Sequence, residues 1–284
     1  MSFGYKILGF GSGGLAFTYI EATGGDSIAT DGDYKVHTFT NPGTFTVASV
    51  GDDRTPSTFR DKISYVVVGG GGSAGGRVGA GAGHGGAGGF RANDATAGGS
   101  FTPVSPLAAP VGAFTVSASP GSYPISIGGG GSPVSGHVNG NAGGTSTGFS
   151  IASSGGGLGG QGNHPNTSGN GGAGSSGGGG GGDTPGTRPG GPGNNPSTSP
   201  PQGQPGGAGY NPGAGGSGGG AGGAGASTWP VTPGPGTPHG ITGSDVTYSE
   251  GGPSSTMGGQ PGFATGPGLD GGVVIRYRFQ GVPA

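Results

Sequence analysis

The chain has no cysteine, a single tryptophan and few charged residues, which make up 8% of its 284 residues. The absence of cysteine excludes disulfide bonds, thiolate catalysis and cysteine-ligated metals. Its ten basic and twelve acidic residues are scattered singly, so neither a basic patch for nucleic acid nor an acidic tail is expected. No apolar run approaches the roughly 20 residues of a membrane span, and glycines interrupt the apolar start of the chain. We therefore expect neither membrane insertion nor a secretory signal.

Motifs that carry chemistry are also scarce. Gly9 to Gly14 matches the G-x-G-x-x-G pattern of dinucleotide-binding proteins, and Asp31 and Asp33 lie about 20 residues further on. The pattern requires a helix after its glycines. The residues that follow are β-branched, aromatic and broken by glycine, and such a match is expected by chance among 83 glycines. We predict no cofactor site.

Metal-binding and catalytic groupings are not recognisable either. The serines lack a nucleophile elbow between a strand and a helix, and no two carboxylates are placed for acid–base work. Asp31 to Asp33 and the pair Asp52 and Asp53 are interpreted as turns in contact with water. The histidines stand alone, without the spacing of a metal site: His37, His84, His137, His164 and His239. We predict no catalytic residue, no metal site and no enzyme.

Glycine, in contrast, is abundant, and it concentrates between Gly155 and Ser244 with proline, serine, asparagine, alanine and threonine. The only charges in this tract are Asp183 and Arg188, and its few large apolar side chains cannot form a core. Ordering ninety residues costs roughly 90 to 180 kcal/mol of conformational entropy. Composition alone is therefore typical of a disordered chain.

An ordered alternative exists for such a tract. The left-handed helix of the polyproline II type has three residues per turn and no internal hydrogen bonds, so its backbone groups must bond neighbouring passes. Only glycine lets backbones pack that closely. Gly213, Gly216, Gly219, Gly222 and Gly225 recur in register, although glycine does not occupy every third position as in collagen. We predict a bundle of several antiparallel or mixed passes between about Gly128 and Gly268.

Reversals of this bundle should lie at clusters of proline, asparagine and serine. These are Asn163 to Asn166, Pro192 to Pro201 and Thr232 to His239.

Strand patterns surround the glycine-rich tract. Tyr34 to Phe39 and Thr44 to Val50 are predicted to form a hairpin around Asn41-Pro42-Gly43, and the continuous apolar run Ile63 to Val68 indicates a central strand. Further strands are predicted at Phe114 to Ser117, Ser122 to Ile127, Thr147 to Ala152 and Val273 to Phe279. No segment has a helical apolar period.

The predicted fold class is all-β: a small antiparallel β-sandwich frame with an inserted glycine-rich bundle of polyglycine or polyproline II helices, and almost no α-helix. Val273 to Phe279 is expected to pair in the same sheet as Ile63 to Val68 and to close the frame. The expected organisation is an N-terminal arm (1–24), a β frame with glycine-rich insertions (25–152), a scaffold (153–268) and a closing strand (269–284).

Several segments, in this order, resemble the glycine-rich domain of bacteriophage tail and fibre proteins: DGDYKVHTFTNPGTFTV, ISYVVVGGGGSAGG, SYPISIGGGGSP, NGNAGGTSTGFSIASSGGG and GGVVIRYRF. The resemblance covers about residues 24 to 280 and implies a β frame with polyglycine-helix bundles whose connecting loops contact a host receptor. The opening MSFGYKILGFGSGG looks like a short segment shared among virion proteins of marine phages. The chain departs from fibre proteins in having no long shaft-forming repeat and no chaperone-like domain.

This resemblance implies a non-enzymatic virion protein, assembled in the host cytoplasm, most simply a tail fibre or fibre tip for host attachment. The alternatives are a capsid or tail decoration protein, or a glycine-rich ice-binding or extracellular structural protein. Its partners would be other virion proteins, further copies of itself, as a trimer, and a host surface receptor.

Two groups of residues are candidates for these contacts. The N-terminal arm either covers its own frame or inserts into a neighbour, and its apolar side chains include Tyr5, Ile7, Leu8, Phe10 and Phe17. Receptor contacts are expected from loop residues of the scaffold, because aromatic and arginine side chains anchor many interfaces: His164, Arg188, Tyr210, Trp229 and His239. The alternative for Tyr210 and Trp229 is that their rings cover the ends of the glycine lattice.

Overall fold

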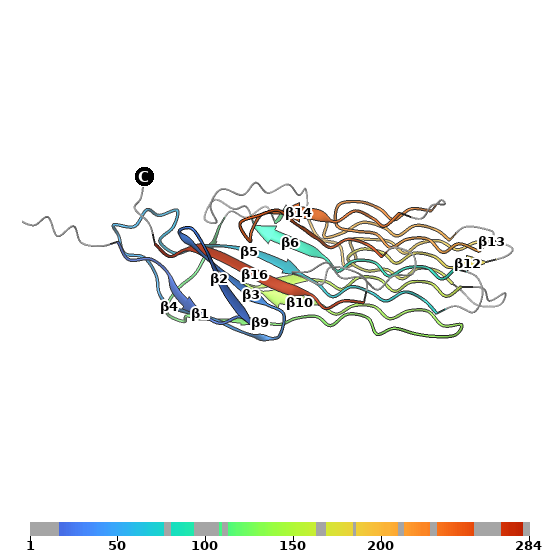
Figure 1. The fold of residues 1–284 in the computed structure, drawn as a ribbon, viewed down its shortest axis with the longest axis horizontal. Helices are drawn as coiled ribbons and strands as arrows, with labels where there is room; N and C mark the ends of the chain where they lie inside the picture. The colour runs from blue at the N-terminus through green and yellow to red at the C-terminus, as the bar shows by residue number, and fades with distance from the viewer. Residues whose placement is uncertain are drawn as a thin grey trace, which may run out of the picture.

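The computed structural model describes residues 17–76, 81–93, 108–109, 113–162, 169–183, 186–209, 213–227, 232–252 and 268–280, with residues 108, 109, 183, 186 and 187 described by their backbone alone. This part of the chain is all-β, with no helix and with several sheets whose strand pairs are antiparallel except for β6 and β7. The molecule is elongated (Figure 1): the larger sheets occupy one end, and β12 and β13 lie at the other.

The largest sheet has seven strands. Its order along the sheet is β2-β3-β16-β5-β6-β7, and β8 pairs with β5. The bounds of these strands are β2 (Ser27–Asp31), β3 (Tyr34–Phe39), β5 (Lys62–Val68), β6 (Phe90–Asn93), β7 (Ala108–Ala109), β8 (Phe114–Thr115) and β16 (Gly272–Arg278). β16 pairs with β5 so that Val273 lies opposite Val67, more than two hundred residues away in the chain. The predicted closure of the frame by the C-terminal strand is confirmed.

A three-stranded sheet packs against one face of the seven-stranded sheet. It consists of β1 (Glu21–Thr23), β4 (Gly43–Ser49) and β9 (Ser122–Ile125), in the order β1-β4-β9. The two sheets share a hydrophobic cluster in which Phe45 and Val47 of β4 meet Tyr65 of β5 and Ile275 of β16. These four side chains are at most 2% exposed. This cluster, the first core, explains the alternating apolar positions of β4.

The opposite face of the seven-stranded sheet has its own core. Val66 and Val68 of β5 and Val274 of β16 pack there with Ile241, near the C-terminal end of the glycine-rich tract, and with Tyr248, just after it. Strand β5 is therefore buried on both faces, as its continuous apolar run predicts. The closing strand β16 also contributes to both cores, since Val273, Ile275 and Tyr277 belong to the first core and Val274 to this second core.

The hairpin predicted around Asn41-Pro42-Gly43 is wrong, although both of its strands exist. β3 belongs to the seven-stranded sheet and β4 to the three-stranded sheet, so the chain crosses between the sheets at this turn. The Asp26 carboxylate fixes the crossing, because it accepts hydrogen bonds from the backbone N–H groups of Thr40 and Asn41 at 2.7 and 2.9 Å. β3 instead pairs with β2, which the sequence did not predict.

Gly24 and Gly25 mark a second crossing, from β1 to β2. Both have positive φ angles, of 106° and 98°, which favour glycine. A Cβ atom on Gly24 would lie 2.1 Å from the carbonyl oxygen of Thr44. The residues before this crossing belong to the frame: β1 pairs with β4, and Ile20 is 1% exposed. The part of the expected arm from Ile20 to Thr23 therefore packs on the frame of its own chain.

Short antiparallel pairs complete the strands. Residues predicted as one strand, Thr147 to Ala152, form a hairpin of two strands instead. The pairs are β10 (Ser146–Gly148) with β11 (Ile151–Ser153), β12 (Gly182–Asp183) with β13 (Gly186–Thr187), and β14 (Thr237–His239) with β15 (Val246–Tyr248). Because Thr237 to His239 is a strand, the reversal predicted at Thr232 to His239 is wrong.

The glycine-rich residues form extended passes that lie side by side and exchange backbone hydrogen bonds. We call these segments the glycine-rich passes: 69–76, 81–89, 138–144, 154–162, 169–174, 176–182, 188–193, 202–209 and 213–220. The first two lie between β5 and β6, earlier in the chain than expected. The reversal predicted at Pro192 to Pro201 is confirmed, because Gly206 and Gly209 donate N–H groups back to Gly191 and Arg188. The reversal predicted at Asn163 to Asn166 lies outside the described residues.

Candidate functional site

The backbone bonds of the glycine-rich passes change direction with a period of three residues. Within pass 176–182, consecutive N–H groups point to three different neighbouring passes in turn. Ser176, Gly179 and Gly182 donate to the carbonyls of Ala87, His84 and Gly81; Gly177 and Gly180 donate to Gln204 and Gly207; Gly178 and Gly181 donate to Gly172 and Gly169. Each pass therefore binds several neighbours at once.

The same rotation holds at the other side of the lattice. In pass 69–76, Gly69, Gly72 and Gly75 donate to Gly89, Gly86 and Gly83, whereas Gly70, Ser73 and Gly76 donate to Gly144, Asn141 and Val138. The distances in this set are 2.8 to 3.0 Å. A Cβ atom on Gly178 would lie only 1.8 Å from the carbonyl oxygen of Leu158, so a side chain would separate the two passes. Glycine is required here because the backbones are in contact.

The few side chains inside this lattice are small or polar. Ser175 is fully buried, and its hydroxyl donates to the carbonyl of Ala87 at 3.1 Å or to that of Gly155 at 3.0 Å. Gln202 is also fully buried; its Oε1 accepts the N–H of Ser154 at 2.9 Å and its Nε2 donates to the carbonyl of Pro196 at 3.0 Å. These side chains replace backbone partners where the passes meet the sheets. Sequence reasoning did not identify them.

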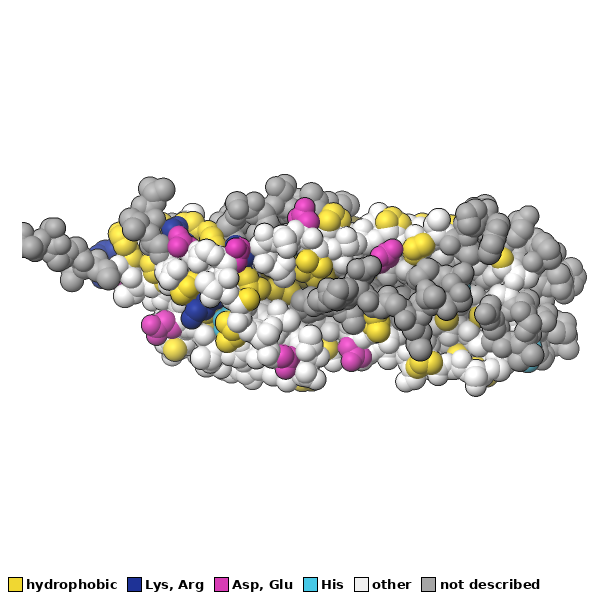
Figure 2. All heavy atoms as spheres, in the orientation of Figure 1, with side chains coloured by type: hydrophobic (Ala, Val, Ile, Leu, Met, Phe, Trp, Pro, Cys, Tyr) yellow, Lys and Arg dark blue, Asp and Glu magenta, His cyan; other side chains and the backbone are white. Residues whose placement is uncertain are grey.

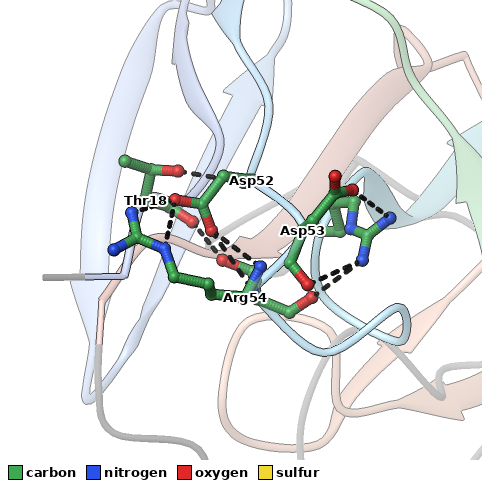
Figure 3. A network of polar contacts seen from close by, with 6 residues as sticks. Thr18, Asp52, Asp53 and Arg54 are labelled. Carbon is green, nitrogen blue, oxygen red and sulfur yellow. Dashed lines mark hydrogen bonds and ion pairs between the residues drawn. The ribbon is translucent and has the colours of Figure 1, made fainter. Parts of the chain in front are cut away.

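A polar network holds the point where the described chain begins (Figure 3). The hydroxyl of Thr18 accepts the N–H of Asp52 at 2.9 Å, and the hydroxyl of Thr55 donates to the carbonyl of Thr18. Arg54 donates its Nε to the Asp52 carboxylate at 3.0 Å. This hydrogen bond from Arg54 lowers the pKa of Asp52 to about 2. The carboxylate is therefore ionised at neutral pH, and the network remains intact there.

The assembly residues of the arm fall on both sides of this point. Phe17 is 38% exposed, which agrees with a side chain that is free to meet another surface. Tyr5, Ile7, Leu8 and Phe10 lie outside the described residues.

Removal of residues 2–16 is expected to leave the frame folded, because it retains every described core residue, among them Tyr19 and Ile20. Removal of residues 2–20 should lower the free energy of unfolding by about 2 to 5 kcal/mol, since it deletes the buried Ile20 and the Thr18 anchor. Urea unfolding of the two truncated proteins measures the difference. Equal losses in both would show that the anchor contributes nothing.

Of the expected receptor-binding residues, only Arg188 and His239 are described. Arg188 is partly buried and follows β13 at the end of the molecule far from the large sheets (Figure 1). Among the described side chains visible in Figure 2, acidic and basic groups lie over the sheets and the middle of the molecule, and none is seen at the far end. His164, Tyr210 and Trp229 lie outside the described residues.

His239 is corrected: it is a core residue and presents no surface to a receptor. Its ring is fully buried in β14, 5.9 Å from the ring of Phe90, and its Nδ1 accepts the N–H of Ile241 at 3.2 Å. Burial lowers the pKa of His239 to about 4, against a smaller opposite effect of Asp245. Burial also lowers the pKa of His37, which is partly offset by its hydrogen bond to the carbonyl of Gly24.

This burial predicts an acid-sensitive fold. A histidine whose pKa is lower in the folded state contributes full stability above its unfolded pKa of about 6.5, and this contribution is lost as the pH falls towards the folded value. For His239 the loss should reach about 3 kcal/mol near pH 4. Urea midpoints between pH 4 and pH 7.5 measure it.

The matched variants are His239→Asn, which keeps an acceptor for Ile241 N–H, and His137→Gln at an exposed position. The first variant should lose less stability than the unmodified protein as the pH falls from 7.5 to 4, and the second should lose as much as the unmodified protein. If His239→Asn lost as much stability at low pH as the unmodified protein, His239 would not be the cause of this loss.

Within the described residues, no group of three histidine, aspartate or glutamate side chains could hold a metal ion. The same part of the chain contains no helix that is long and apolar enough to span a membrane.

No model of a known protein family matches the chain, and no curated protein sequence is significantly similar to it.

Proposed function

We propose that the glycine-rich passes form a polyglycine II-type helix bundle. The support is the three-residue rotation of their hydrogen bonds, which matches the three residues per turn of the polyproline II helix. In pass 176–182 all the bonds described above go to other passes, as a helix without internal hydrogen bonds requires. Such a bundle is stiff because each pass is bonded to several neighbours.

On this basis we propose a structural virion protein, a tail fibre or fibre tip that takes part in host attachment. The observation that carries the proposal is an elongated molecule in which glycine-rich passes with few charged side chains extend from a β frame to the end where β12 and β13 lie (Figure 1). The frame would face other virion proteins and further copies of the chain, as a trimer. The loops at the far end would meet a host surface receptor. The order of motifs shared with phage glycine-rich domains supports the same assignment.

The deciding experiment is immunogold labelling of purified phage particles with antibodies against the recombinant chain, together with mass spectrometry of the particles. Label at the outer end of a tail fibre is expected. Label on the capsid or along the tail would support the decoration protein instead, and absence from the particles would refute a virion role. Clear thermal hysteresis at micromolar protein would support the ice-binding alternative.

Trp229→Ala tests where recognition occurs. If Trp229 contacts a receptor, the variant should be folded and incorporated, and adsorption to host cells should fall about tenfold, the effect of losing a central interface residue. If its ring covers the end of the lattice instead, thermal stability should fall and adsorption should decrease only in proportion to the folded protein. Adsorption and melting curves of the same preparation distinguish these results.

A further inference from the structure

Strand β2 forms an edge of the seven-stranded sheet, and no described strand pairs with its outer side. It stands at the end of the strand order, and Ser27, Ile28, Ala29 and Thr30 are exposed. Its pairing with β3 is regular over all five residues. Edge strands of natural sheets are usually protected by lysine, proline or a bulge, because their outer N–H and C=O groups otherwise pair with another strand. Residues 27–31 contain neither lysine nor proline.

A row of side chains across the sheet stops at this edge. Tyr65 lies opposite Ile275, Ile275 opposite His37, and His37 opposite Ile28. The first three side chains are at most 1% exposed, whereas Ile28 is 52% exposed. An apolar side chain on an additional strand would cover Ile28 and extend the row by one residue. The edge therefore fits a strand with an apolar residue opposite Ile28.

The chain itself supplies a suitable strand close to this edge. The ring of Tyr19 lies 5.9 Å from the guanidinium of Arg278, which bonds Asp33 at 3.0 Å, two residues after β2 ends. The sixteen residues that precede Phe17 include Tyr5 to Phe10, in which apolar residues surround a single lysine. The six residues from Gly11 to Ala16 can span about 20 Å. A five-residue strand is about 17 Å long, so this link is long enough.

We propose that residues Tyr5 to Phe10 add as a strand to the outer edge of β2 in the same chain. A short flexible link gives the segment a local concentration in the millimolar range, which favours its own edge over that of another molecule. The added strand covers Ile28 and prevents β2 from pairing with further copies. This inference does not depend on the proposed role in a virion.

Disulfide scanning tests the pairing cleanly, because the chain has no cysteine of its own. Ile28→Cys is combined in turn with Lys6→Cys, Ile7→Cys, Leu8→Cys and Gly9→Cys, and each protein is oxidised with oxidised glutathione. Cross-links within one chain are expected at alternate positions, since successive side chains of a strand point to opposite faces. The control replaces Ile28→Cys with Val138→Cys, an exposed apolar position in a glycine-rich pass, and should give no such alternation.

Each other result overturns the proposal. Cross-links between chains would show that a second copy occupies the edge, and equal cross-linking at all four positions would show a segment without strand geometry. Hydrogen exchange provides a test without cysteines: amides of residues 27–31 should exchange at least tenfold faster when residues 2–10 are removed. Unchanged exchange would also refute the pairing.

Discussion

Gly219→Val is expected to destabilise the protein by on the order of 3 kcal/mol or more, with loss of order in the glycine-rich passes. A Cβ atom at this position would lie 2.2 Å from the carbonyl oxygen of Gln204 and 2.6 Å from that of Pro205. The backbone of Gly219 is fixed from both sides, because its N–H donates to Gly177 at 2.9 Å and its carbonyl accepts from Ala87 at 3.0 Å. Relief of the clash therefore requires a whole pass to move.

The matched control is Gly129→Val. A Cβ atom on Gly129 would meet only the Asp270 carboxylate, at 3.7 Å, although the carbonyl of Gly129 also accepts a bond from the N–H of Gly144. The control should change the free energy of unfolding by less than about 1 kcal/mol. Urea unfolding of both variants measures the contrast. Gly222→Val should behave like Gly219→Val, because its Cβ would lie 2.4 Å from the carbonyl oxygen of Gly236. Normal stability of both variants would refute close backbone packing.

The sequence was sufficient to predict the central strands. The nearly continuous apolar run Ile63 to Val68 indicates a central position, and the alternation of Val273 to Phe279 indicates a strand expected in the same sheet. The two strands are indeed neighbours. The partner of β3 could not be predicted in this way. Tyr34 to Phe39 and Thr44 to Val50 both have an apolar face for the first core, and this pattern fits a hairpin in one sheet as well as two strands in facing sheets. The bonds from Asp26 to Thr40 and Asn41, which support the crossing, connect residues outside any regular pattern.

The arrangement of the glycine-rich passes was beyond sequence reasoning for a different reason. Passes made of glycine have no side chains that distinguish one neighbour from another, so the sequence can suggest backbone packing but cannot assign partners. Passes 69–76 and 81–89 are an example. The first bonds residues 138–144 and the second bonds residues 213–219, and nothing in the sequence distinguishes these partners from other glycine-rich segments. Side chains such as Gln202 do specify a position, but only the folded chain shows which backbone groups they bond.

The roles of the candidate site residues also depend on contacts that the sequence does not reveal. His239 was expected among the loop residues of the scaffold, yet pairing of β14 with β15 brings it into the second core beside Phe90. Thr18 was included in an arm whose partner the sequence could not identify. Its bonds to residues of the loop after β4 show that it belongs to the frame. In both cases a contact distant in sequence decided the role of the residue.

Deletion of the last twelve residues, 273–284, is expected to unfold the frame as well as to release the glycine-rich passes. β16 lies between β3 and β5, so its loss removes two rows of backbone pairing from the middle of the sheet. It also removes Val273, Val274, Ile275 and Tyr277, all fully buried. Large side chains of this kind contribute about 2 to 5 kcal/mol each, so together they are comparable to the 5 to 15 kcal/mol by which most domains are stable.

Circular dichroism and solubility measure the effect of this deletion, with deletion of residues 281–284 as the control that keeps β16 complete. The control should retain the melting curve of the full chain. Because the larger deletion is expected to aggregate, Ile275→Ala provides a graded test and should cost about 2 to 5 kcal/mol through the cavity it leaves in the first core. A soluble, β-rich protein without residues 273–284 that melts like the full chain would show that β16 is an accessory strand. The expected result instead makes β16, the last strand in the chain, the one on which both cores depend, because its side chains alternate between them.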